Sequence, residues 1–216
     1  MSGLMKRVLT AIVFIPIVIA SLYWGQWAFY SLVLVVSLIA MFELKVMFDA
    51  MDISIWAPVL YTSSIIFLTL AQWRQESYLP SLMFAVFLFI ALCEVFCKSP
   101  EPFRRGGSTL FAVFYGAFLP THFLLLRGDN HALELLLLVL LGTWAADTGA
   151  YFTGRRFGRR KLAPHISPNK SIEGAFGGVV AAVFVISYFH LFLQTQLLPG
   201  WVLGVAIGLG AILGDL

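Results

Sequence analysis

Residues 132–153 read ALELLLLVLLGTWAADTGAYFT, and this stretch decides both the fold class and the place where chemistry should be sought. It has about 20 mostly apolar residues, which is the length that a helix needs to cross the roughly 30 Å hydrocarbon core of a bilayer. Besides Glu134 at its start, it contains one carboxylate deeper in the apolar run, Asp147. Apolar runs of similar length recur along the whole chain, so the stretch predicts one of several transmembrane helices.

The composition supports a membrane protein. Of the 216 residues, 60% are hydrophobic and only 12% are charged, and the mean hydropathy is +0.91. A soluble domain of this length needs a more polar surface. We therefore predict an all-α fold, a polytopic transmembrane helical bundle that forms a single membrane domain over residues 1–216. About eight spans are expected, at residues 8–24, 26–48, 55–72, 79–97, 108–126, 132–153, 174–193 and 197–216.

The distribution of basic residues predicts the orientation. If the N-terminus is cytoplasmic, only Arg74 and Arg127 of the 14 Lys and Arg residues fall on the outer side. Cytoplasmic loops of membrane proteins carry such an excess of positive charge. We thus expect a multi-pass protein of the cell (inner or plasma) membrane, with both termini and the loop 154–173 cytoplasmic. The first span could also be a signal peptide, but it continues to Trp24 without a clear cleavage site, so a retained helix is favoured.

Asp147 is the first candidate for a functional residue. It lies some six residues before the cytoplasmic end of its predicted span, where a carboxylate costs up to about 2.5–3.5 kcal/mol. Thr143, Asp147 and Tyr151 share one helix face because they are four residues apart. Beside them runs a stripe of small residues that allows another helix to approach closely: Gly142, Ala146, Ala150 and Gly154. The alternative is that Asp147 only caps or pairs with a neighbouring helix.

The last two predicted spans repeat this combination of small residues and a carboxylate. Small residues recur at intervals of four at Gly174, Gly178 and Ala182. In the final span one helical face holds Gly204, Gly208, Ala211 and Asp215. Two carboxylates on glycine-lined helices indicate a close-packed bundle with a cation or phosphate site at its cytoplasmic end. Carboxylate oxygens suit Mg²⁺, which commonly takes one or two carboxylates together with substrate phosphates.

The longest polar connection, residues 154–173, contains six basic residues. Such a loop can serve only to fix topology or to contact anionic lipid, at about 1 kcal/mol for each cation near the surface. That interpretation does not account for residues 167–174, SPNKSIEG, in which serines, a lysine and a glutamate precede a glycine-rich helix. Hydroxyl groups, a lysine and a helix N-terminus together favour phosphate binding.

Three segments in this order resemble the phosphatidate cytidylyltransferases, the CDP-diacylglycerol synthases of phospholipid synthesis. They are WAADTGAY at 144–151, GRRFGRRKLAP at 154–164 and SPNKSIEG at 167–174. The resemblance covers essentially the whole chain and is strongest in residues 143–178 and 214–216. It implies that residues 1–131 supply the N-terminal spans, and that residues 132–216 form the cytidylyltransferase-like catalytic region.

The resemblance also implies a reaction in which the phosphate of phosphatidic acid attacks the α-phosphorus of CTP and expels pyrophosphate. Such chemistry depends mainly on positioning and on charge neutralisation. CTP and phosphatidic acid would be the substrates and Mg²⁺ the cofactor, with no nucleic acid partner; a homodimer is left open. The implied metal residues are Asp147 and Asp215, the implied catalytic residues are Asp147, Lys161, Lys170 and Glu173, and the implied substrate-binding residues are Ser167, Asn169, Ser171, Arg159 and Arg160.

The sequence departs from the family pattern in two places. In the family, the Gly-Asp-Leu found here at 214–216 opens a further cytoplasmic segment with a lysine–aspartate pair, Pro-Gly-His-Gly-Gly and Asp-Arg. The sequence stops at Leu216. From this we expect a partial or truncated chain, with an incomplete metal and nucleotide site and an activity that could be lost. The second departure is Asn169 and Ser171, where the family more often has lysine and threonine, so phosphate binding could be weaker.

Other functional classes remain as alternatives. An ion-coupled transporter could use Asp147 and Asp215 as an ion path, but discontinuous helices and symmetry between halves would be expected and are not seen. A non-catalytic membrane scaffold is another alternative. A prenol or lipid kinase is a closer one, and it would convert CTP to CDP instead of pyrophosphate.

Two further features lie in the N-terminal half. Glu94, in the middle of a predicted span between the free cysteines Cys93 and Cys97, is either a functional acid or a partner for another helix. Tryptophans near the predicted span ends are expected to be interfacial anchors; these are Trp24, Trp27, Trp56, Trp73 and Trp201.

Overall fold

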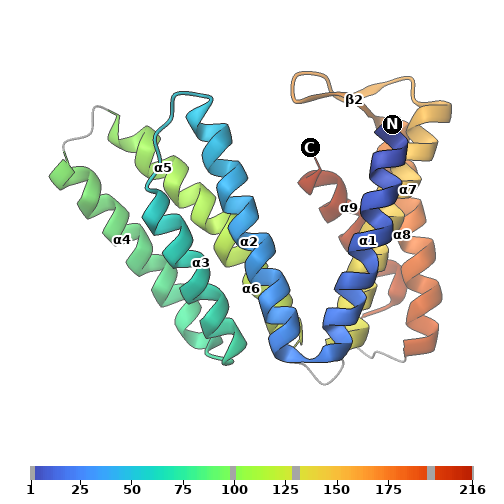
Figure 1. Cartoon of the computed structure of the whole chain (residues 1–216). Coiled ribbons are helices and arrows are strands. Elements are labelled where there is room, and N and C mark those ends of the chain that lie inside the picture. The colour runs from blue at the N-terminus through green and yellow to red at the C-terminus, as the bar shows by residue number, and fades with distance from the viewer. Residues whose placement is uncertain (1–2, 98–100, 128–131, 194–197, 216) are drawn as a thin grey trace. The chain divides into compact units, whose positions relative to one another are not determined.

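The computed structural model of the chain describes residues 3–97, 101–127, 132–193 and 198–215, and these are nearly all helical (Figure 1). The chain divides into two compact units, residues 1–129 and 130–216. The first unit contains α1 (Gly3–Trp24), α2 (Gln26–Asp49), α3 (Ala57–Gln72), a 3₁₀ turn (Glu76–Tyr78), α4 (Leu79–Cys97), α5 (Pro102–Val113), a π-helical turn (Phe114–Phe118) and α6 (Leu119–Arg127). The second contains α7 (Ala132–Phe157), β1 (Lys161–Ala163), β2 (Ser167–Ser171), α8 (Ile172–Leu193) and α9 (Gly200–Gly214).

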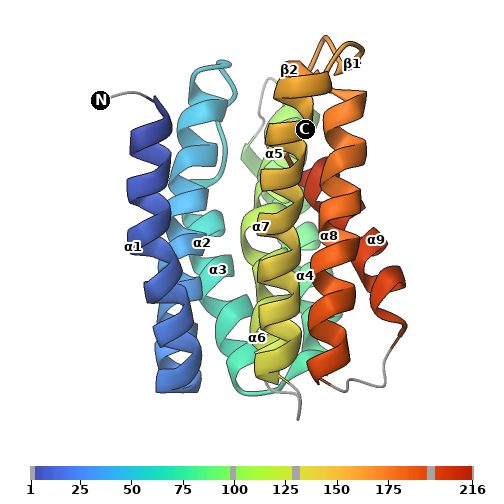
Figure 2. The ribbon, with the colours of Figure 1, turned by 90° about the vertical axis from the view of Figure 1, so that its right-hand side faces the viewer.

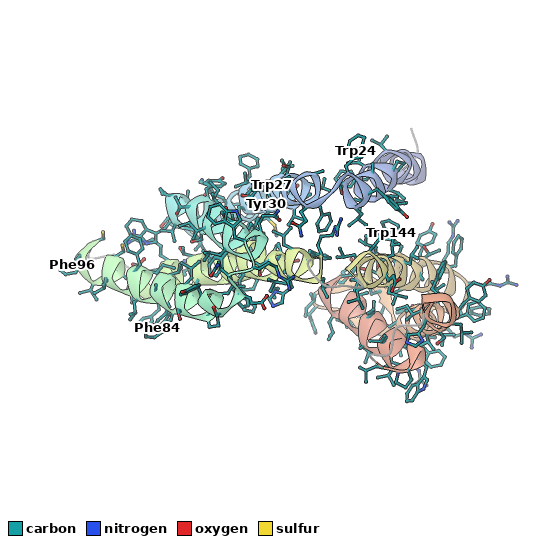
Figure 3. The ribbon with its side chains drawn as sticks, turned by 90° about the horizontal axis from the view of Figure 1, so that it is seen from below. Trp24, Trp27, Tyr30, Phe84, Phe96 and Trp144 are labelled. Atoms are coloured by element: carbon teal, nitrogen blue, oxygen red, sulfur yellow. The ribbon has the colours of Figure 1, made fainter. Side chains whose placement is uncertain are left out.

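The all-α membrane fold predicted from composition is confirmed. Five described helical segments are long and apolar enough to cross a bilayer: Gln26–Asp49, Glu76–Cys97, Pro102–Arg127, Leu133–Phe157 and Ile172–Leu191. Three shorter apolar helices accompany them, at Val13–Trp24, Ala57–Gln72 and Gly200–Gly214. Large apolar side chains such as Phe84 and Phe96 point outward from α4 (Figure 3), as a surface that faces lipid requires. The number of spans and their orientation stay predictions.

The predicted span 108–126 is longer in the structure, because α5, the π-helical turn and α6 form one apolar segment from Pro102 to Arg127. Pro120 lies just beyond the turn and has no N–H for the carbonyl of Gly116, which is four residues earlier. The hydroxyl of Ser37 in α2 donates a hydrogen bond to this carbonyl. A buried polar group freed by proline is thus satisfied by a neighbouring helix.

Glu94 takes the second of its two predicted roles, as a partner for a neighbouring helix. Its carboxylate accepts hydrogen bonds from Nε and Nη2 of Arg105 in α5, at 2.8 and 3.1 Å, and from Nε1 of Trp56 at 2.7 Å. Only 9% of Glu94 is exposed. The guanidinium group of Arg105 also lies 4.5 Å from the centre of the Trp56 ring. The indole N–H of Trp56 is thus used by this ion pair, and the role of Trp56 as an interfacial anchor stays a prediction.

In the second unit, α8 packs along α7 at positions that lack side chains (Figure 2). A β-carbon placed on Gly149 of α7 would lie 2.5 Å from the β-carbon of Ala181 and 2.8 Å from the carbonyl oxygen of Gly177. One placed on Gly178 of α8 would lie 2.8 Å from the carbonyl oxygen of Ala146. The predicted small-residue stripes are thus the contact surface of α7 and α8.

Helix α9 packs against another face of α8 in the same way. A β-carbon on Gly204 would lie 2.5 Å from the Cα of Val183, and one on Gly208 would lie 3.2 Å from the β-carbon of Ala182. By contrast, no atom of the described residues lies within 4 Å of a β-carbon placed on Gly210. The spacing of Gly204 and Gly208 therefore determines which face of α9 meets α8.

The first prediction concerns these contacts. Gly149→Val should destabilise the purified protein in detergent by about 1–3 kcal/mol, because the added atoms collide with the backbone of α8. Gly210→Ala is the matched control, and it should leave the midpoint of thermal unfolding unchanged or raise it, since alanine favours helix by up to about 1 kcal/mol over glycine. Thermal unfolding followed by size-exclusion chromatography would measure both. Equal effects of the two substitutions would contradict the packing described.

Candidate active site

The segment between α7 and α8 is more ordered than the predicted loop 154–173. Helix α7 continues past the predicted span to Phe157, so Asp147 lies ten residues, or about 15 Å, before the end of the helix. Beyond it, β1 and β2 form an antiparallel hairpin in which Lys161 is opposite Ser171 and Ala163 is opposite Ser167. The hairpin lies beyond the ends of α7 and α8 and above the C-terminal end of α9 (Figure 1).

Ser171 joins the hairpin to α8. Its hydroxyl oxygen accepts a hydrogen bond at 3.1 Å from the N–H of Gly174, in the first turn of the helix. Serine is favoured at this position because it satisfies one of the helix N–H groups that have no partner within the helix. The N–H of Ile172 donates to the carbonyl oxygen of Arg160 at 3.0 Å, which ties the helix start to the other strand.

Three glycines make room for Ser171. β-carbons placed on Gly154, Gly158 and Gly174 would lie 3.1, 2.7 and 3.0 Å from its hydroxyl oxygen. A β-carbon on Gly158 would also lie 2.2 Å from the carbonyl oxygen of Gly154. The spacing Gly154-x-x-x-Gly158 is not that of a phosphate-binding loop; its glycines allow the end of α7 and the start of α8 to close around one serine.

Glu173 holds the first strand at its base. Its carboxylate accepts hydrogen bonds from the backbone N–H of Arg159 at 3.1 Å and from that of Arg160 at 3.2 and 3.3 Å. A carboxylate in the first turn of a helix is also favoured by the helix dipole. These backbone contacts leave the side chains of Arg159 and Arg160 exposed.

Three of the residues predicted for metal and phosphate binding lie near one another. Nζ of Lys170 in β2 lies 3.0 Å from Oδ2 of Asp215, which follows the last turn of α9. The carboxylate of Asp147 is close enough to interact electrostatically with both of them. The side chain of Lys170 is 23% exposed and that of Asp215 is 70% exposed. Three segments distant in sequence thus form a cluster of one cation and two carboxylates, which we call the charged cluster.

The ammonium group of Lys170 is buried but only partly satisfied. Its Nζ atom is close enough to Asp215 for an ion pair. The angles do not fit a hydrogen bond there, and Nζ has no hydrogen-bond partner elsewhere among the described residues. Because an ammonium group has three N–H donors, it can still donate to a phosphate oxygen. The charged cluster therefore offers both carboxylate oxygens for a cation and N–H donors for an anion.

A model of the cytidylyltransferase family matches residues 5–216 of the chain. The chain belongs to this family. Among its relatives is the phosphatidate cytidylyltransferase of Bacillus subtilis, which is 30% identical over 99% of the chain and 80% of the relative. That of Staphylococcus epidermidis is 31% identical over 97% of the chain and 82% of the relative. That of Haemophilus influenzae is 45% identical, over 40% of the chain and 32% of the relative. The resemblance stated from sequence is confirmed.

The structure separates the family residues into two groups. Asp147, Lys170 and Asp215 form the charged cluster, whereas Ser171 and Glu173 shape the base of the hairpin. The five residues of β2 face only three of β1, so the register is irregular; the side chains of Ser167, Lys170 and Ser171 are half-buried, whereas Asn169 is exposed. The hydroxyl of Ser171 is already used as a helix cap, a role that the sequence analysis missed although serine followed by a helical segment is a signal for it.

The donor set of this cytidylyltransferase suits a hard divalent cation that is shared with substrate. Among the described residues, no group of three or more His, Cys, Asp and Glu side chains could hold a metal ion. Asp147 and Asp215 provide two carboxylates, which is the usual number for Mg²⁺ when waters and substrate phosphates complete its shell. The residues thus fit a metal bound together with a phosphate-bearing ligand better than a metal held by protein alone.

The second prediction tests the base of the hairpin. Glu173→Ala removes the acceptor for the N–H groups of Arg159 and Arg160, so trypsin should cleave after Arg159, Arg160 or Lys161 several-fold faster. Glu173→Gln keeps one carbonyl oxygen and should have an intermediate effect. The rate of cleavage of the folded protein in detergent, followed by mass spectrometry, measures this. Equal cleavage rates for all three proteins would contradict the role given to Glu173.

Proposed function

We propose that the chain transfers the CMP group of CTP to phosphatidic acid, which gives CDP-diacylglycerol and pyrophosphate. The main support is the match over 97–99% of the chain with proteins named phosphatidate cytidylyltransferase. An oxygen of the lipid phosphate forms a bond to the α-phosphorus of CTP. The bond between this phosphorus and the oxygen that bridges to the β-phosphorus breaks, and pyrophosphate leaves with that electron pair.

The charged cluster supports this proposal because both substrates are phosphates. Asp147 and Asp215 would hold Mg²⁺, which when bound neutralises phosphate charge and orients the phosphates. Lys170 would donate to a phosphate oxygen from the same cluster, and its buried position strengthens such a contact. Placing two anionic phosphates together is the main barrier to the reaction, and positioned cations lower it.

The hairpin would supply the remaining contacts. Lys161, Arg159 and Arg160 are exposed cations next to the base fixed by Glu173. Ser167, Asn169 and Ser171 follow on the facing strand. Glu173 would orient the segment and would not touch the reacting atoms. With the loop on the cytoplasmic side of the cell membrane, CTP would reach the site from the cytoplasm and phosphatidic acid from the adjoining leaflet.

The third prediction is the activity itself. Membranes that contain the chain, supplied with phosphatidic acid, Mg²⁺ and CTP labelled at the α-phosphate, should transfer label into the lipid phase and release unlabelled pyrophosphate. Release of CDP with label left in the aqueous phase would instead indicate a kinase. No labelled lipid above the level of empty membranes, with the chain shown to be inserted, would refute the proposed function.

The fourth prediction concerns the carboxylates. Asp147→Asn should lower the rate of CMP transfer by roughly 10²–10³-fold, the loss typical of removing one group that stabilises charge in the transition state. Asp49→Asn is the matched control, because among the described residues the carboxylate of Asp49 pairs only with the exposed Lys45 on α2, and it should retain the full rate. A full rate for Asp147→Asn would remove Asp147 from the site.

A further inference from the structure

The end of α7 and the following hairpin expose five cations: Arg155, Arg156, Arg159, Arg160 and Lys161. Within the described part of the chain, none of the five forms an ion pair with a carboxylate. Arg155 donates a hydrogen bond to the hydroxyl of Tyr151 at 3.0 Å, and the guanidinium group of Arg156 lies 5.6 Å from the centre of the Phe157 ring. These contacts orient the two arginines but leave their charge uncompensated, so the surface is suited to a multiply anionic partner.

The same surface also exposes apolar side chains. Ile166 lies in the turn between β1 and β2 and is 72% exposed. Phe157, the last residue of α7, is 58% exposed. Most of the Ile166 side chain is left unburied by the fold, and a purely aqueous partner such as a free nucleotide would not bury it either. Cations together with an exposed apolar tip are typical of surfaces that bind at the membrane interface.

The length of α7 places this surface at the level of the lipid headgroups. Its 26 residues span about 39 Å, whereas the hydrocarbon core is roughly 30 Å thick. Because charged side chains are costly in the hydrocarbon core, we expect the last turns, with Arg155 and Arg156, to extend into the headgroup region, where the hairpin begins. Glu173 fixes the base of the hairpin through hydrogen bonds from the backbone N–H groups of Arg159 and Arg160. The position of the hairpin tip relative to the end of α7 is therefore constrained.

We propose that the hairpin and the end of α7 form a docking surface for the negatively charged face of the bilayer in which the chain resides. The arginines bind phospholipid phosphates, and Ile166 enters the boundary between headgroups and acyl chains. This proposal rests on the proposed function in one respect: phosphatidic acid is taken as the anionic lipid that the surface binds. By raising the local concentration of this substrate beside Lys170, it would favour a lipid phosphate over other phosphates.

Insertion of the tip can be measured without any enzyme assay. The variant Ile166→Cys, made in a chain with Cys93→Ser and Cys97→Ser, is labelled with the fluorophore NBD and placed in vesicles of phosphatidylcholine with or without phosphatidic acid. We expect blue-shifted emission, and quenching by lipids with a nitroxide on the acyl chain, only when phosphatidic acid is present. High salt should reverse both, because the attraction is screened.

Arg155→Gln with Arg156→Gln tests the charge. This variant should need a higher fraction of phosphatidic acid for half of the spectral change, by roughly fivefold for each arginine removed. Arg104→Gln is the control, since Arg104 is on the side predicted to be cytoplasmic but pairs with Glu101. If the double variant does not fold, the salt reversal in the parent chain makes the same test.

Three results would overturn the proposal: a label that stays in water in both kinds of vesicle, equal insertion in phosphatidylcholine alone, or equal effects of the control and the double variant. A chain that inserts its tip but transfers no CMP would refute the proposed function and keep the docking surface. A chain that transfers CMP without insertion of the tip would refute the docking surface and keep the proposed function.

Discussion

Helix α8 lies so close to α7 and to α9 that several contact positions have no space for a side chain. Gly149, Gly178 and Gly204 are the clearest cases, because a β-carbon on any of them would overlap backbone or β-carbon atoms of the facing helix. In a membrane, helices gain little from burying apolar surface against each other, so close backbone contact and the dispersion energy it brings are what hold them together. The rest of the second unit depends on this constraint.

The charges of the candidate site follow from that packing. Gly154, Gly158 and Gly174 let the end of α7 and the start of α8 close around Ser171, which caps α8. These contacts hold the two ends of the hairpin together. Glu173 also fixes the start of β1, because its carboxylate accepts hydrogen bonds from the backbone N–H groups of Arg159 and Arg160. Lys170, one residue before the cap, then reaches Asp215 because α9 is held against α8. A buried ammonium group and two carboxylates from three segments are thus brought together by helix packing and by hydrogen bonds to the backbone.

Composition and residue spacing predicted the membrane fold and the small-residue stripes, because both are local properties of the chain. The hairpin was not predicted, because the sequence of β2 has no apolar alternation. Its pairing with β1 depends on the close packing of glycines from α7 and α8 around Ser171. Helix α7 continues beyond the predicted span because arginine ends an apolar run without ending a helix, being a good helix former. The contact of Trp56 with the Glu94–Arg105 pair was not predicted, because nothing near Trp56 in the sequence reveals that pair. The pairing of Lys170 with Asp215 likewise joins residues that only tertiary structure brings together.

The candidate site depends most directly on the close approach of α9 to α8, which brings Asp215 to Lys170, and a disulfide cross-link between the two helices measures this approach. In the chain with Cys93→Ser and Cys97→Ser, cysteines at Ala182 and Gly208 should form a disulfide on mild oxidation in membranes, since their β-carbons would lie 3.2 Å apart, close to disulfide geometry. Cysteines at Ala182 and Gly210 should not, because the β-carbon of residue 210 meets nothing within 4 Å. Mass spectrometry of the oxidised chain distinguishes the two. A cross-link in the second pair and none in the first would contradict the packing on which the site depends.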